Sequence, residues 1–139
     1  MNNSILATIT KLLLGVLYFT ESESPFKAAN WGKITPSELL QKIATDYHSV
    51  PANLKQLEHP IFFNHIISKV DAADVPMVEN ARKIEEFYSV LKQNLSNLQV
   101  IRVEGASRIP VLITGYLDDD TCIVIETFAV ETWEINPIH

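Results

Sequence analysis

Apolar residues recur every three or four positions in four stretches of the chain, which is the spacing of helices that bury one face. The longest stretch runs from about Pro76 to about Leu95, with Asp74 placed to cap its start. It keeps a period of 3.6 residues throughout, so we expect a helix roughly 30 Å long. Its buried face is expected to comprise Met77, Val78, Ala81, Ile84, Phe87, Tyr88, Leu91 and Leu95.

The other three predicted helices are shorter. One is capped by Thr35, followed by Pro36 at the first helical position and by Glu38 at the capping-box site. Another is capped by Ser4 near the N-terminus, and the third follows Pro60. Because residues 51–53 read Pro-Ala-Asn, we expect an irregular connection there.

The pattern changes in the last third of the chain, where Val, Ile and Thr dominate. Residues 99–104, 109–116 and 121–130 are separated by turn-forming residues and are predicted to be strands. The acidic residues 118–120 lie between the last two strands, so we expect them to form the solvated tip of a hairpin.

The last two predicted strands are apolar on both faces. In residues 121–130, one face carries Cys122 and Val124, and the other carries Ile123 and Ile125. A sheet that is apolar on both faces must be covered on both. The predicted fold is therefore α+β: a three-layer α-β-α sandwich with a mainly antiparallel sheet, formed by a single domain spanning residues 1–139.

The stretch 20–26, Thr-Glu-Ser-Glu-Ser-Pro-Phe, places two carboxylates two residues apart among hydroxyl side chains. Pro25 excludes a helix interior and biases the preceding residue towards an extended backbone. We therefore expect an extended segment at a surface edge, with Glu21 and Glu23 on the same side. A solvated edge, a binding edge and an acid–base pair all remain open, although wet surroundings disfavour the raised pKa that catalysis needs.

Composition narrows the classes of partner. The 139 residues are 47% hydrophobic and 20% charged, which fits one globular domain with a real core. The net charge is −6, and the 11 Lys and Arg residues form no cluster. This charge disfavours nucleic acid as a partner and favours encounter with a basic protein.

Three further features bear on where the protein works. Residues 12–19 are apolar, but a membrane span needs ~20 residues. Residues 1–4 carry no positive side chain, which disfavours a signal peptide. Cys122 is the only cysteine, so no internal disulfide can form. We expect a cytoplasmic protein that has no membrane contact and is a monomer in the free state.

The sequence contains no familiar catalytic or cofactor motif. Its four glycines are too far apart for a phosphate-binding loop, and no Gly-x-Ser-x-Gly elbow occurs. His59 and His65 are too widely spaced for a helical pair of metal ligands, and one cysteine disfavours zinc. We expect no cofactor and no metal bound by this chain alone. His65 is expected at the edge of the core, and Cys122 as a small buried hydrophobe.

Three stretches together resemble a known family. Residues 17–26, Leu-Tyr-Phe-Thr-Glu-Ser-Glu-Ser-Pro-Phe, are similar to an apolar-Ser-Glu-Ser-Glu-aromatic-Pro-Phe signature. Residues 90–95 with 99–102, and the closing Val-Glu-Thr at 130–132, are the other two. They resemble the nuclease A inhibitor family, small cyanobacterial proteins that block a sugar-nonspecific DNA/RNA nuclease. The order agrees over nearly all of residues 4–132, more loosely in 27–80, and the family's helix–sheet–helix fold matches the predicted layers.

The resemblance implies an enzyme inhibitor rather than an enzyme. The family's target holds a catalytic divalent metal in a basic cleft, where an acidic edge can sit in place of substrate phosphates. In the family, the first Glu of the signature and a C-terminal Thr lie at that contact. They match Glu21 and Thr132 here, with Ser22 and Glu23 as neighbours.

The chain departs from the family at its end. Family members can stop at Val-Glu-Thr, whereas here residues 133–139 form a C-terminal extension. A contact made by a terminal carboxylate is then lost, moved to His139, or replaced by Glu131 or Glu134. Trp133 could add an apolar anchor at the interface, since Trp is favoured at hot spots, or it could fold back onto the core.

Two alternatives to this inhibitor remain open. Residues 74–77 read Asp-Val-Pro-Met where the family has an acidic, tryptophan-bearing stretch, so the same fold could bind a different protein. The other alternative is a small-ligand or enzymatic domain. It requires a concave pocket near Glu21 or Glu126 that holds a titratable group with a perturbed pKa.

Overall fold

A computed structural model describes residues 2–131 of the chain. Its helices are α1 (Asn2–Leu12), α2 (Pro36–Asp46), α3 (His59–Ser68) and α4 (Val75–Asn94), with a 3₁₀ turn, η1 (Pro51–Asn53). Its strands are β1 (Leu17–Phe19), β2 (Glu23–Pro25), β3 (Lys27–Lys33), β4 (Leu54–Leu57), β5 (Ser96–Val103), β6 (Arg108–Tyr116) and β7 (Thr121–Val130).

Five strands form the main sheet in the order β3-β7-β6-β5-β4, and every neighbouring pair in it is antiparallel. The two shortest strands, β1 and β2, pair with each other as a separate hairpin. The prediction of an α+β fold with a mainly antiparallel sheet is confirmed.

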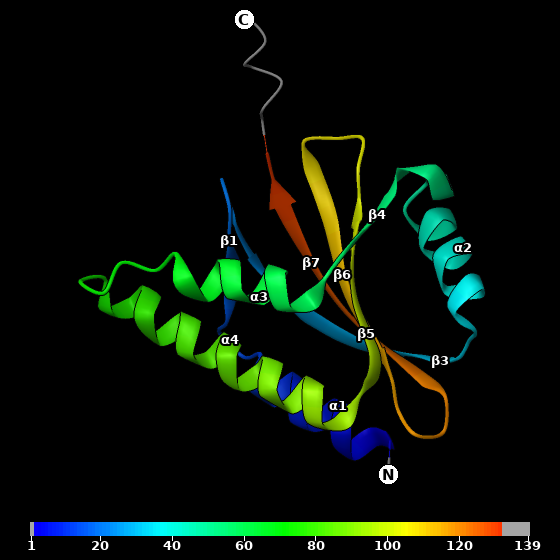
Figure 1. The fold of residues 1–139 in the computed structure, drawn as a ribbon, viewed down its shortest axis with the longest axis horizontal. Helices are drawn as coiled ribbons and strands as arrows, with labels where there is room; N and C mark the ends of the chain where they lie inside the picture. The colour runs from blue at the N-terminus through cyan, green and yellow to red at the C-terminus, as the bar shows by residue number, and fades with distance from the viewer. Residues whose placement is uncertain (1, 132–139) are drawn as a thin grey trace, which may run out of the picture.

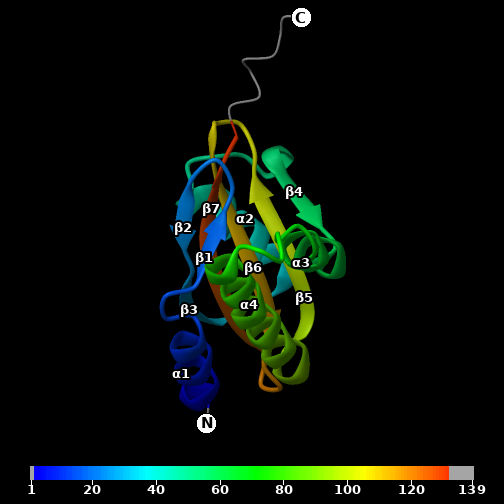
Figure 2. The ribbon, with the colours of Figure 1, turned by 90° about the vertical axis from the view of Figure 1, so that its left-hand side faces the viewer.

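Helices lie on both sides of the main sheet. Figures 1 and 2 show α1, α3 and α4 on one side and α2 on the other. The side chains of β7 alternate accordingly: Ile123 and Ile125 join the larger core cluster, which includes Phe87 of α4. Cys122 and Val124 join the smaller cluster beneath α2. Both faces of β7 are therefore buried, as the sequence predicts.

The helix ends test the predicted caps. The Thr35 hydroxyl accepts from the Glu38 N–H (3.2 Å), and the Glu38 carboxylate accepts from the Thr35 N–H (2.9 Å). This confirms the capping box. Asp74 caps α4 by accepting from the Met77 N–H (3.2 Å). The predicted Ser4 cap is wrong, because α1 already includes this residue and the Ser4 carbonyl accepts from the Thr8 hydroxyl instead.

One further element and two boundaries differ from the sequence prediction. The edge strand β4 was not predicted, because Leu-Lys-Gln-Leu lacks β-branched residues and the strand exists only through its pairing with β5. Strand β5 begins at Ser96 rather than Gln99. Helix α3 begins at His59, so Pro60 lies within its first turn, where a missing N–H costs nothing.

Candidate functional site

The acidic stretch 20–26 is not one extended edge, and that prediction is wrong. The chain reverses at Glu21: Phe19 pairs with Glu23 and Tyr18 with Ser24, forming the β1–β2 hairpin. The Thr20 N–H donates to the Ser22 carbonyl (2.8 Å), which closes the turn. Local pairing satisfies backbone groups that a lone extended segment would leave to water. Glu21 therefore occupies the exposed tip of the hairpin, and the exposed Glu23 begins its second strand.

Hydroxyl side chains attach this hairpin to β7. Strand β3 pairs with β7 only as far as Glu126, which leaves the last residues of β7 without a strand on that side. The Phe128 N–H donates to the Ser24 hydroxyl (3.1 Å), and the Val130 N–H donates to the Thr20 hydroxyl (2.9 Å). The two hydroxyls thus continue the hydrogen-bond ladder where β3 ends.

The tip of the hairpin also touches the end of β7. The Glu21 N–H donates to the Val130 carbonyl (3.3 Å), so Glu21 lies next to the strand end that leads into Glu131. The structure therefore brings Glu21 close to the end of β7, although more than a hundred residues separate the two segments, and Ser22 and Glu23 follow Glu21 in the same hairpin. The other two candidates, Thr132 and Trp133, lie outside the described residues.

The base of the hairpin is fixed by Asn80 of α4, a residue that the sequence analysis missed. The Leu17 N–H donates to Asn80 Oδ1 (2.9 Å), and Asn80 Nδ2 donates to the Leu17 carbonyl (2.8 Å). One side-chain amide thereby satisfies both backbone groups of Leu17. A lone Asn in an amphipathic helix gives no signal of this role, because the partner is far away in the sequence.

Glu131 is held by Arg102 of β5, which sequence analysis also did not single out as a site residue. Two guanidinium nitrogens donate to the two Glu131 oxygens (2.9 and 3.0 Å), and Arg102 Nε donates to Glu104 (2.8 Å). Hydrogen bonds from Arg102 lower the pKa of Glu131. The end of β7 is therefore anchored by a bidentate ion pair, which is geometrically specific.

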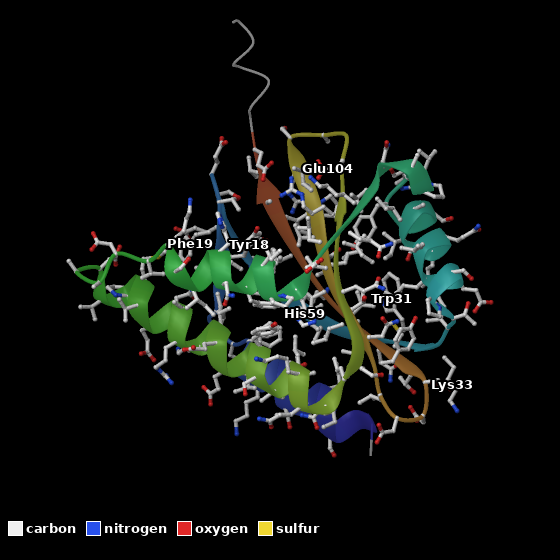
Figure 3. All side chains as sticks on the ribbon, viewed as in Figure 1. Tyr18, Phe19, Trp31, Lys33, His59 and Glu104 are labelled. Carbon is white, nitrogen blue, oxygen red and sulfur yellow. The ribbon has the colours of Figure 1, made fainter. Side chains whose placement is uncertain are left out.

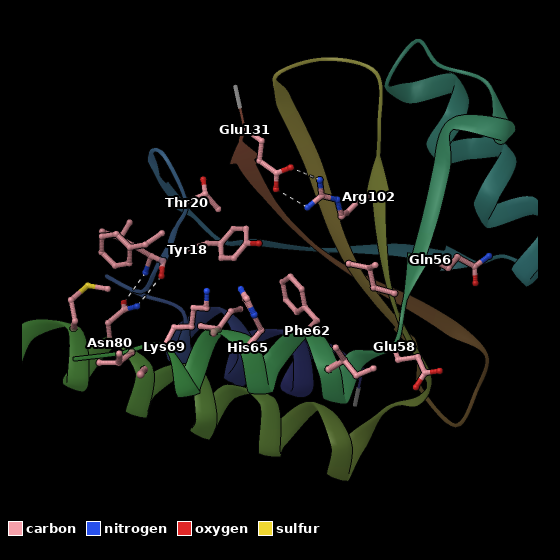
Figure 4. Close-up of a pocket in the computed structure, with 18 residues that line it drawn as sticks. Tyr18, Thr20, Gln56, Glu58, Phe62, His65, Lys69, Asn80, Arg102 and Glu131 are labelled. Atoms are coloured by element: carbon pink, nitrogen blue, oxygen red, sulfur yellow. Dashed lines mark hydrogen bonds and ion pairs between the residues drawn. The ribbon is translucent and has the colours of Figure 1, made fainter. Parts of the chain in front are cut away.

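A groove of about 650 Å³ opens beside the hairpin (Figure 4). It lies between β1, α3 and the start of α4, and Arg102 and Glu131 form part of its wall. We call it the hairpin groove. Its apolar lining comprises Leu17, Phe19, Leu57, Ile61, Phe62, Ile66, Val70, Met77 and Ala81. His65 is exposed and lines this groove, so its predicted place at the core edge is wrong.

Three ionisable groups of the groove, Tyr18, Arg102 and Glu131, have shifted pKa values. Burial raises the pKa of the Tyr18 phenol, and the ion pair lowers that of Glu131 and raises that of Arg102. Each of these shifts moves the group's pKa further from neutrality. Glu126, the other carboxylate considered above, accepts a hydrogen bond from the Tyr47 hydroxyl on the α2 side of the sheet.

Within residues 2–131, no group of three or more His, Cys, Asp or Glu side chains could hold a metal ion. None of the helices in this range is long and apolar enough to cross a membrane. Cys122 is fully buried, and desolvation raises the pKa of its thiol to about 11, which confirms a small buried hydrophobe.

Comparison with known proteins assigns the family. No curated protein gives a significant match to the chain. The family model described as nuclease A inhibitor-like protein matches residues 3–132, which include the hairpin, the groove and the whole sheet. The chain therefore belongs to the nuclease A inhibitor-like family.

Proposed function

We propose that this chain is a non-catalytic protein inhibitor of a sugar-nonspecific, metal-dependent DNA/RNA nuclease. The main support for this proposal is the hydrogen bond that joins the Glu21 tip of the hairpin to the end of β7. It makes one surface of two segments that the family resemblance associates with the nuclease. The partner-binding residues we propose are Glu21, Ser22, Glu23, Glu131, Thr132 and Trp133.

Glu21 is the proposed principal contact with the nuclease active site. It lies at the exposed tip of a hairpin that is hydrogen-bonded to β7 and α4, so little backbone ordering remains to be done on binding. A carboxylate on such a tip can take the place of a substrate phosphate near a catalytic metal. The net charge of −6 favours encounter with a basic cleft.

Glu131 has a different proposed role. Its carboxylate is already paired with Arg102, so approach to a metal would break a bidentate ion pair. We propose that Glu131 fixes the direction in which the chain continues to Thr132. The complex is expected to contain one inhibitor and one nuclease, formed in the cytoplasm from a monomeric inhibitor whose single domain spans residues 1–139.

The hairpin groove favours a second candidate function, the binding of a small ligand. Its volume falls within the roughly 300–1,000 Å³ of known ligand pockets, and its lining is mainly apolar. Binding of an apolar probe that leaves nuclease inhibition unchanged would favour this second function. A same-fold module that binds a different protein remains the outcome if no nuclease is inhibited.

The test is a titration of nuclease activity on plasmid DNA, using a sugar-nonspecific nuclease from the same source. Activity is expected to fall to zero near one molar equivalent of this protein. Full activity in large excess would overturn the inhibitor proposal, and a pull-down would then identify the partner.

A matched pair of variants tests the role of Glu21. Glu21→Ala is expected to weaken the complex at least tenfold, equal to about 1.4 kcal/mol, because a charge pair at the active site is lost. Glu85→Ala removes an exposed carboxylate on α4 and controls for net charge. Equal affinities of the two variants would contradict the role given to Glu21.

A further inference from the structure

The hairpin groove exposes apolar side chains that no described residue covers. Ile61 of α3 is 67% exposed, and Phe19 of β1 is 36% exposed. Figure 4 shows Tyr18 of β1 and Phe62 of α3 close to each other in the groove, and their ring centroids are 5.6 Å apart. Monomeric proteins seldom leave a concave apolar surface open unless something binds there. The groove therefore lacks an occupant within residues 2–131.

The last described residue of the chain is itself part of the groove wall. Glu131 lines the groove together with its ion-pair partner Arg102. The residues that follow therefore start at the mouth of the groove. An extended chain rises about 3.4 Å per residue, so residues 133–138 can reach roughly 7 to 24 Å beyond Glu131.

The chemistry of these residues suits the groove. Residues 133–138 read Trp-Glu-Ile-Asn-Pro-Ile, so an extended backbone would place Trp133 and Ile135 on one face. The intervening Glu134 carries a negative charge, and the groove is lined by the exposed Lys69. An apolar face fits the apolar lining, and the carboxylate has a cation within the same groove.

We propose that the segment Trp133–Ile138 docks into the hairpin groove of its own chain, with Trp133 and Ile135 against the apolar lining and Glu134 towards Lys69. The covalent link at Glu131 favours this occupant over a second molecule, because a short tether gives a millimolar effective concentration. Weak contacts are then enough to fill the groove. This docking concerns the free protein and does not rest on the proposed function, in which Trp133 has to leave the groove to contact the nuclease.

Trp133 can report directly on docking. The chain has two tryptophans, and Trp31 packs near α2 on the opposite side of the sheet (Figure 3). In the full chain carrying Trp31→Phe, fluorescence therefore comes from Trp133 alone. We expect a blue-shifted emission maximum and an acrylamide quenching constant severalfold lower in the native protein than in urea. A quenching constant equal to that of the unfolded chain would overturn the proposal.

Variants locate the binding surface. In the Trp31→Phe background, Ile61→Asp is expected to restore fast quenching, whereas Leu14→Asp is expected to have no effect. Leu14 is 70% exposed, close to the 67% of Ile61, and lies outside the groove. Circular dichroism serves to check that each variant is folded. If Ile61→Asp does not fold, Lys69→Glu supplies the test, because it repels Glu134 and is expected to increase quenching.

Two other results would also overturn the proposal. Protection of Trp133 that disappears on dilution would assign the groove to the tail of a second copy. Protection that survives both Ile61→Asp and Lys69→Glu in folded protein would show that Trp133 packs elsewhere.

Discussion

Strand β7 has an acidic turn at each end, and the two turns differ in what they touch. The turn before β7, at residues 118–120, contains three aspartates and closes on itself. There the Leu117 N–H donates to the Thr121 carbonyl and the Asp120 N–H to the Leu117 carbonyl, both at 2.9 Å. The turn at the far end contains Glu21 and is hydrogen-bonded to the end of β7. Figure 1 shows the two turns at opposite ends of the sheet.

The comparison shows that acidic composition alone does not identify a binding surface. The aspartate turn has more carboxylates, but its backbone bonds serve the hairpin that it closes. The hairpin that carries Glu21 is attached to two other parts of the molecule: its turn is hydrogen-bonded to the end of β7, and its base is hydrogen-bonded to Asn80 of helix α4. A turn held from several sides can present a carboxylate in a fixed place, which is what recognition of an active site requires.

The largest expected change in the free energy of unfolding comes from removing the two side-chain hydrogen bonds that attach the hairpin to β7. The double variant Thr20→Val with Ser24→Ala removes the acceptors of the Val130 and Phe128 N–H groups. Leaving two partly buried donors unpaired should lower the free energy of unfolding by about 3 kcal/mol. Urea unfolding measures this change. The exposed Ser68→Ala is the control, and an equal loss in both variants would mean that the hydroxyls do not anchor the hairpin.

A smaller loss of unfolding free energy is expected from removing the ion pair that holds the end of β7. Arg102→Met removes the partner of Glu131, whose side chain is 36% exposed, so solvent screening limits the loss of unfolding free energy to about 2 kcal/mol at neutral pH. The control is Arg82→Met, which removes a solvent-exposed ion pair with Glu79 and should lower the free energy of unfolding far less. Similar losses would contradict a special role for Arg102.

The contribution of Arg102 should also depend on pH. A carboxylate whose folded pKa is lowered stabilises the protein above its unfolded pKa and loses that contribution as pH falls through the folded pKa. The difference between wild type and Arg102→Met should therefore be constant down to about pH 5 and shrink below about pH 4. A difference that grows in acid would show that Glu131 is not the stabilised group.

The parts of the fold that rest on local patterns were predictable from the sequence. Helix α4 follows from its period of 3.6, and α2 follows from Thr35 and Glu38. The two apolar faces of β7 required a cover on each side of the sheet. In these cases the residues that specify the element lie within it, so one stretch of sequence carries the necessary information.

The candidate site was less predictable, because its contacts join residues that are far apart in the sequence. Ser24 bonds Phe128 and Thr20 bonds Val130, at separations of 104 and 110 residues. No local pattern reveals that these hydroxyls extend the β7 ladder. The family resemblance associated Glu21 with residues 130–132. The ion pair between Arg102 and Glu131 could not be predicted in this way, because it depends on the register of β5, β6 and β7.

The smallest effect is expected at the aspartate turn. Asp120 has a φ of 69°, a left-handed conformation that glycine adopts without strain. Asp120→Gly should therefore raise the free energy of unfolding by about 0.5 kcal/mol, the relief of strain outweighing the greater entropy of the unfolded chain. Asp118→Gly is the matched control. Asp118 is not among the residues with positive φ, so the same replacement should destabilise the protein slightly.

The same two variants sharpen the contrast between the turns of β7. Because the aspartate turn lies at the opposite end of the sheet from Glu21, we expect both variants to inhibit the nuclease as strongly as the wild type. A loss of inhibition comparable to that of Glu21→Ala, in a variant that unfolds no more easily than the wild type, would place the aspartate turn in the interface. The binding surface would then have to span the length of β7, and the attachment of the Glu21 turn would no longer explain why that turn binds.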